Sequence, residues 1–161
     1  MNDAFLLFTR NAWTDKLIRV GTGSNAGHVG IGIGDSHVID TTLVHGCRLW
    51  DRAEWLSHRT LVDEIAVPAA SPAHAAAADA YVRKAVAENW RYDWLEIVGF
   101  VLMRDMGDPD RGVCSSLARV FFEARTGHRL RTRVGRTTPR HMEIAAGAYL
   151  AGYTASPIAR G

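Results

Sequence analysis

Residues 27–40 read GHVGIGIGDSHVID, and this stretch decides the fold of the chain. Its first half alternates strictly between aliphatic residues and glycines behind His28, which predicts a strand with all its apolar side chains on one face. The other face carries His28 followed only by glycines. A sheet face made of glycine lets a backbone or a substrate approach closely. We therefore expect a half-buried strand with an unoccupied face beside His28.

The turn after this strand decides which side chain of the next strand lies beside His28. A three-residue turn at 34–36 pairs Ile33 with His37 and places Asp40 on the face of His28, about 7–8 Å away along the diagonal. A two- or four-residue turn places His37 there instead, because a shift of one residue turns every side chain of a strand over. The three-residue turn keeps the aliphatic residues of both strands together. Asp40 is therefore the expected neighbour of His28, and His37 is the alternative.

The remaining pattern predicts an α+β fold with an antiparallel sheet packed against helices. Apolar runs typical of strands lie at 4–9, 38–42, 47–50 and 60–67. Helical spacing and capping signals indicate helices at 13–20, 52–57, 72–89, 94–103 and 114–126, and one more that starts at Pro139. No internal repeat, low-complexity segment or linker divides the 161 residues, so we expect a single domain over 1–161.

Cys114 is the candidate nucleophile. It would lie in the first turn of its helix, where free backbone N–H groups and the positive end of the helix dipole stabilise a thiolate. The same N–H groups can donate to an oxyanion, and Ser115 is a weaker candidate for the same task. A glycine before the cysteine and two hydroxyl residues after it favour exposure at a helix tip. The alternative is a buried structural cysteine, a common fate of this residue type.

A thiol nucleophile needs a base, and the base needs a third group that orients its ring. His28 is the candidate base, and it would later protonate the leaving group. Asp40 is the candidate orienting group, with His37 as its rival. The sequence therefore predicts a Cys-His-Asp triad that forms an acyl-enzyme intermediate.

Composition excludes several other classes of function. A formal charge of +2 gives no reason to expect nucleic acid as a partner. The seven histidines show no metal-binding spacing, so we expect neither a metal nor another cofactor. Residues 21–26 resemble a dinucleotide-binding glycine pattern but precede a strand, which is the wrong context. The tryptophans are interpreted as packing residues, as is Cys47, which lies in an apolar strand.

Positive charge is concentrated in one segment, because no acidic residue lies between Glu123 and Glu143. Six arginines fall there, at positions 125, 129, 131, 133, 136 and 140. Such a run usually forms only a solvated surface, but it could also bind an anionic polymer such as cell-wall material. We see no signal peptide and no membrane span, which predicts a cytoplasmic protein, or one exported without a Sec signal, as an effector or phage product would be.

At these residues the sequence resembles the permuted papain-fold amidases, the YiiX/YaeF-like branch of the NlpC-type cysteine peptidase superfamily. In that branch the histidine strand precedes the cysteine helix. The matching pieces span most of the chain in the expected order: Ile18 to Gly34, Val38-Ile39-Asp40 with Gly46, Tyr92-Asp93, Cys114-Ser115-Ser116-Leu117, and Thr138-Pro139.

The resemblance implies a circularly permuted papain-like core with Cys114 as nucleophile, His28 as base and Asp40 as the orienting residue. It implies an amide hydrolase, for which stem peptides of peptidoglycan are the expected substrate. Lecithin:retinol acyltransferase-like enzymes share the permuted order, so a lipid or thioester acyltransferase or hydrolase remains an alternative. A third hypothesis is a non-catalytic binding module that uses the basic segment 125–140.

Overall fold

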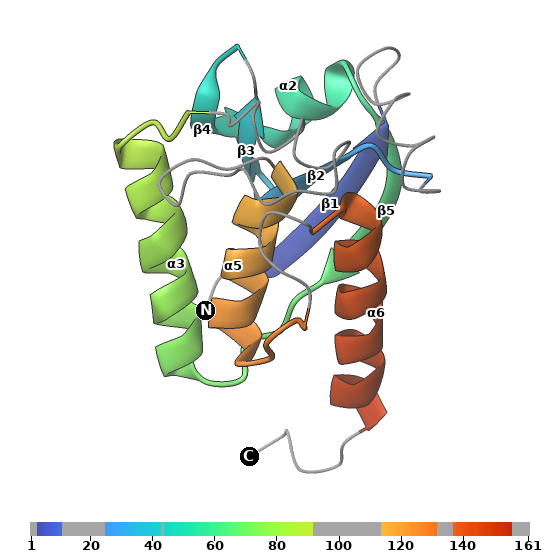
Figure 1. Cartoon of the computed structure of the whole chain (residues 1–161). Helices are drawn as coiled ribbons and strands as arrows, with labels where there is room; N and C mark the ends of the chain where they lie inside the picture. Colours follow the sequence, from blue (N-terminus) through green and yellow to red (C-terminus); the bar gives the residue numbers. More distant parts are fainter. Residues whose placement is uncertain (1–2, 11–24, 43, 92–113, 132–136, 156–161) are drawn as a thin grey trace.

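The computed structural model describes residues 3–10, 25–42, 44–91, 114–131 and 137–155 (Figure 1). These residues form an α+β fold around a five-stranded antiparallel sheet with the strand order β4-β3-β2-β1-β5. The strands are β1 (Ala4–Arg10), β2 (His28–Ile33), β3 (His37–Thr42), β4 (Gly46–Asp51) and β5 (Thr60–Ala66). The predicted α+β class and all five predicted strands are confirmed.

Three helices lie side by side over one face of the sheet (Figure 1). Helix α3 (Pro72–Ala87) contacts β4, α5 (Cys114–Thr126) contacts β2 and β3, and α6 (Pro139–Ala155) contacts β1 and β5. A shorter helix, α2 (Arg52–Ser57), follows β4 directly. The helices predicted at 13–20 and 94–103 lie outside the described residues.

The hairpin between β2 and β3 has the three-residue turn that the sequence predicts. Ile33 pairs with His37 across the two strands. Gly34 opens the turn with a φ of +57°, a left-handed conformation that glycine adopts without steric cost. This register fixes the facing of both strands, and it places Asp40 on the side of His28.

The main core lies between the sheet and the three helices. Val29, Ile31 and Ile39 point from the sheet into this layer, where they meet side chains such as Phe121 of α5. Cys47 is also buried there, as predicted. The alternating aliphatic side chains of β2 and β3 therefore form the surface against which α5 packs.

The glycine face of β2 is occupied, contrary to the expectation from the sequence. The indole of Trp55, a fully buried residue of α2, lies against Gly30 and forms a second small core with Leu7 and Val38. A methyl group built on Gly30 would lie 2.8 Å from both the Trp55 ring and the Val38 side chain. The missing side chain at position 30 thus admits a tryptophan of the same chain rather than a substrate.

Gly30→Ala should lower the free energy of unfolding by about 1–3 kcal/mol, because the added methyl group overpacks the contact with Trp55. Urea denaturation followed by circular dichroism measures the change. Gly147→Ala is the matched control, since nothing lies within 4 Å of a methyl group at that position in α6. There alanine should stabilise the helix by about 0.5–1 kcal/mol. Equal stability of the two variants would contradict the packing argument.

Candidate active site

His28 and Asp40 meet on the face of the sheet that α2 covers. The distance from His28 Nε2 to Asp40 Oδ1 is 2.7 Å. His28 begins β2 and Asp40 lies in the middle of β3, so the hairpin register alone brings the two side chains to one face. The geometric part of the sequence prediction, that Asp40 and not His37 lies beside His28, is confirmed.

Asp40 accepts two further hydrogen bonds on its other oxygen. Trp55 Nε1–H donates to Oδ2 at 2.7 Å, and Arg59 Nη2–H donates to the same oxygen at 3.1 Å. The Asp40 side chain has 0% exposure, so these groups take the place of water. Burial opposes ionisation, but the charge and hydrogen bond of His28, the Trp55 hydrogen bond and the charge of Arg59 lower the pKa of Asp40 below its ordinary value.

Cys114 is the second neighbour of the imidazole. Its thiol lies close enough to the His28 ring to raise the pKa of that ring. Because Asp40 occupies Nε2, Nδ1 is the ring nitrogen left for the sulfur. The three residues proposed from the sequence therefore form one contiguous line, carboxylate to imidazole to thiol.

The surroundings of His28 favour its charged form. Burial lowers the pKa, but Asp40 and Cys114 outweigh this through their charges and hydrogen bonds, and the pKa of His28 is raised well above its ordinary value of 6.5. The charged ring therefore stabilises the fold fully below pH 6.5, and this contribution is lost as the pH rises through the folded-state pKa. Asp40 acts in the opposite sense, since its stabilising contribution is lost as the pH falls through its lowered pKa.

Cys114 is the first residue of α5, as predicted, but it is not exposed at a helix tip. It has 4% exposure, and both serines after it are buried as well. The reason is that α5 packs against the sheet, on β2 and β3. The His28 side chain keeps 12% exposure, so this pair of residues is not entirely enclosed.

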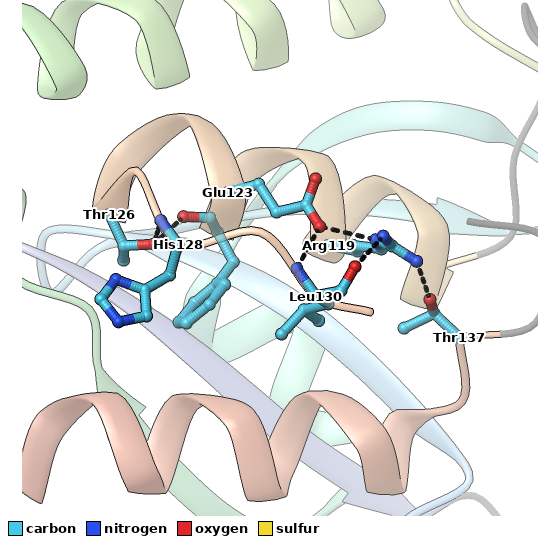
Figure 2. A network of polar contacts seen from close by, with 7 residues as sticks. Arg119, Glu123, Thr126, His128, Leu130 and Thr137 are labelled. Atoms are coloured by element: carbon cyan, nitrogen blue, oxygen red, sulfur yellow. Dashed lines mark hydrogen bonds and ion pairs between the residues drawn. The ribbon is translucent and has the colours of Figure 1, made fainter. Parts of the chain in front are cut away.

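Polar contacts anchor α5 to the segment that follows it (Figure 2). Arg119 donates to the backbone oxygen of Leu130 and to the Thr137 hydroxyl, and it pairs with Glu123 at 2.9 Å. The Ser115 hydroxyl donates to the backbone oxygen of Thr137 at 2.6 Å. The chain thus returns along α5 toward its cysteine end. The Ser115 hydroxyl thus has a structural partner, and the backbone N–H groups of the first helical turn are the ones without a partner inside the helix.

His37 lies at the far end of β3 from the site. It is exposed, and its Nδ1 is hydrogen-bonded to the Ser36 hydroxyl at 2.8 Å. Its alternation puts it on the opposite face from Asp40, because the three-residue turn is the one that forms. The alternative assignment of His37 as the orienting residue is therefore wrong on geometry.

The basic segment is less uniform than its sequence indicates. Arg125 is buried, and its Nε–H donates to the backbone oxygen of Val67 at 2.5 Å. Arg140 is exposed and pairs with Glu143 at 3.0 Å. Arg129 and Arg131 are exposed as well. Arg125 belongs to the core, so the exposed positive charge among the described residues of this segment lies on Arg129, Arg131 and Arg140.

One pocket has none of His28, Asp40 and Cys114 in its lining. This pocket has a volume of about 330 Å³ and is bounded by the hairpin end of the sheet and by α3. Its lining residues are Ile33, His37, Ile39, Leu49, Asp79, Val82, Arg83, Val86 and Ala87. The proposed chemistry therefore depends on hydrogen-bond geometry and not on this pocket.

The described residues hold no group of three side chains suited to a metal ion. Among their helices, none has the length and hydrophobicity that a bilayer crossing requires. Comparisons with protein-family models, curated proteins and solved structures found no match to this chain. The functional argument therefore rests on the sequence and on the geometry above.

Sequence reasoning missed Trp55 and Arg59. Trp55 was expected to be packing only, which is confirmed for its ring but leaves out its N–H group. Arg59 follows α2, and its guanidinium lies 4.7 Å from the centre of the Trp55 ring. A signal was present in the sequence, because a glycine strand face beside a polar residue needs a large side chain from elsewhere to fill it.

Cys114→Ala should lower the pKa of His28, because it removes both the charge and the hydrogen bond that the thiol contributes. Titration of the His28 ring by nuclear magnetic resonance measures this shift. Cys47→Ala is the control, since burial raises the pKa of the Cys47 thiol to about 11 and keeps that thiol neutral. An unchanged His28 titration in the Cys114 variant would show that the thiol and imidazole are not in contact.

Proposed function

We propose that this chain is a cysteine hydrolase in which Cys114 attacks a carbonyl carbon, with His28 as base and Asp40 as the residue that orients it. One observation carries the proposal: the His28 ring is hydrogen-bonded to a buried carboxylate and interacts with a thiol at the start of a helix, which raises the pKa of the ring. Nucleophile, base and orienting group in hydrogen-bond reach of one another are the signature of covalent catalysis.

The chemistry follows from the position of each group. His28 accepts the thiol proton, and the Cys114 sulfur forms a bond to the substrate carbonyl carbon. Backbone N–H groups in the first turn of α5 donate to the oxyanion that develops. The imidazolium then protonates the leaving group as its bond to carbon breaks. Water, deprotonated by His28, attacks the thioester and releases the acid together with the free thiol.

Asp40 supports both proton transfers. It is held ionised, so it accepts a hydrogen bond from the Nε2–H of His28 and leaves Nδ1 available to the sulfur. It also stabilises the imidazolium that forms when the thiol is deprotonated.

The proposed architecture within the α+β class is the circularly permuted papain-like core. The order of the elements supports this architecture. The strand that carries His28 comes first in the chain, and the helix that begins at Cys114 follows much later. The antiparallel sheet with the nucleophile's helix packed across its middle strands is compatible with that core.

The substrate we propose is a peptide-like amide, of which peptidoglycan stem peptides are the expected source. Thr137 lies beside the first two turns of α5, since it accepts hydrogen bonds from Arg119 (Figure 2) and from Ser115. Arg140 follows Thr137 closely, at the start of α6, where it is exposed and paired with Glu143. A cationic side chain at this position would favour an anionic polymer.

Cys114→Ala should reduce turnover of purified peptidoglycan by about ten-thousandfold or more, because the acyl-enzyme cannot form without the sulfur. Release of soluble muropeptides, followed by mass spectrometry, measures the rate. Cys47→Ala is the matched control and should retain activity, since its buried thiol lies in the core. Undiminished muropeptide release by the Cys114 variant would end the proposal.

The same variants separate the other hypotheses. Release of fatty acid from phospholipid or thioester, lost in the Cys114 variant and without muropeptide products, would replace the amide substrate by a lipid acyl group. Salt-sensitive binding to the cell-wall polymer that is unaffected by Cys114→Ala, with no turnover of any acyl substrate, would show a binding module instead.

A further inference from the structure

Among the described residues, the side chains bonded to the Asp40 carboxylate are all hydrogen-bond donors. The partners are the Nε2–H of His28, the Nε1–H of Trp55 and the Nη2–H of Arg59. An indole N–H and a guanidinium have no acceptor atom. The Asp40 side chain is fully buried, so water cannot replace a missing partner. Residue 40 therefore has to accept at both of its side-chain oxygens.

We propose that Trp55 and Arg59 are positioning residues that make residue 40 an obligate acceptor and thereby fix which ring nitrogen of His28 carries the proton. This inference rests on the proposed function for its catalytic meaning. Its physical content concerns the hydrogen-bond pattern alone, and it can be measured without a substrate.

The argument follows from what an amide would do in place of the carboxylate. In Asp40→Asn, one orientation turns the NH₂ group toward Trp55 and Arg59, so that donors face donors. Each buried donor left without an acceptor costs about 1–3 kcal/mol. The other orientation satisfies Trp55 and Arg59 with the carbonyl oxygen and turns the NH₂ group toward His28. The first orientation leaves the donors of Trp55 and Arg59 without an acceptor, whereas the second affects only the N–H of His28. The second orientation is therefore favoured.

That orientation reverses the proton pattern of the imidazole. An NH₂ group facing Nε2 requires Nε2 to accept, so the proton of the neutral ring moves to Nδ1. Nδ1 is the nitrogen left for the sulfur of Cys114. A protonated Nδ1 cannot take the thiol proton. The two donors from α2 and its following turn thus exclude an amide at position 40.

The two positioning residues are fixed by their own contacts. The Trp55 ring occupies the space that Gly30 leaves open. The guanidinium of Arg59 lies 4.7 Å from the centre of that ring, and the Arg59 backbone N–H donates to the Leu56 oxygen at 3.1 Å. The short helix α2 is itself capped by Asp51, whose carboxylate accepts from the Glu54 N–H at 3.0 Å. The donors therefore cannot turn away when residue 40 changes.

A second arginine–tryptophan pair in the same sheet provides a matched control. Arg48 lies opposite Asp40 in the pairing of β3 with β4, and its guanidinium lies 3.5 Å from the centre of the Trp50 ring. In the part of the chain that the structure describes, the Trp50 Nε1 has no acceptor, and Arg48 forms no ion pair with Asp40. Changes to this pair alter the same residue types without touching the Asp40 hydrogen bonds.

The experiment reads the proton position on His28 by ¹⁵N chemical shifts of the histidine ring. All variants carry Cys114→Ala, and spectra are recorded above the pH at which His28 loses its charge. With Asp40 in place, the neutral ring should carry its proton on Nε2. Asp40→Asn should move it to Nδ1. Adding Trp55→Phe and Arg59→Met should return it to Nε2, because no donor then competes for the amide oxygen.

The control variant combines Asp40→Asn with Arg48→Met and Trp50→Phe, and its proton should remain on Nδ1. If the triple change at 40, 55 and 59 fails to fold, Asp40→Asn with Arg59→Met alone should give a mixture of both tautomers, since one donor then faces one donor. Retention of Nε2–H in Asp40→Asn, or its return in the control variant, would overturn the proposal.

Turnover separates this inference from the proposed function. With Cys114 present, Asp40→Asn should lose about ten-thousandfold in kcat, as the reversed tautomer of a triad histidine implies. The further changes Trp55→Phe and Arg59→Met should recover at least about tenfold of that loss, and the changes at 48 and 50 should recover none. The expected tautomers together with no turnover by the unaltered protein would refute the hydrolase and leave the hydrogen-bond assignment standing.

Discussion

The buried carboxylate of Asp40 and its three hydrogen bonds are the constraint on which the rest of this structure depends. Removing an ionised carboxylate from water costs several kcal/mol, and the cost is offset only when donors are held in good geometry. Those donors come from β2, from α2 and from the turn after it. The hairpin register places His28 beside Asp40. The open space at Gly30 and the position of α2 against the sheet bring Trp55 to the same carboxylate.

The same constraint connects stability with the proposed chemistry. Arg59 and the imidazolium of His28 supply positive charge to Asp40, and the thiol of Cys114 adds a second acidic group on the far side of the ring. Charge is therefore balanced within a buried site. Helix α5 contributes the sulfur at its positive end, and Arg119 (Figure 2) and Ser115 connect the first turns of that helix to Thr137.

The sequence predicted that the glycine face of β2 is unoccupied, but in the structure a side chain packs against it. A strand face without side chains does let something approach closely, and here the close neighbour is the indole of Trp55. The indole fills the layer, as interiors at native density require, and its N–H group reaches Asp40. The exposure expected of Cys114 failed for a related reason, since local residue type at the tip of α5 does not reveal that the sheet covers it.

The sequence by itself determined the strands, the helices that the structure describes, and the facing of His28 and Asp40. These features follow from alternation, capping residues and the length of one turn, all of which act over a few neighbouring residues. The tertiary structure alone decided that Cys114 touches His28, that Trp55 and Arg59 donate to Asp40, and that Arg125 belongs to the core. These contacts join residues far apart in the chain, and local periodicity carries no information about which distant side chain fills a given space.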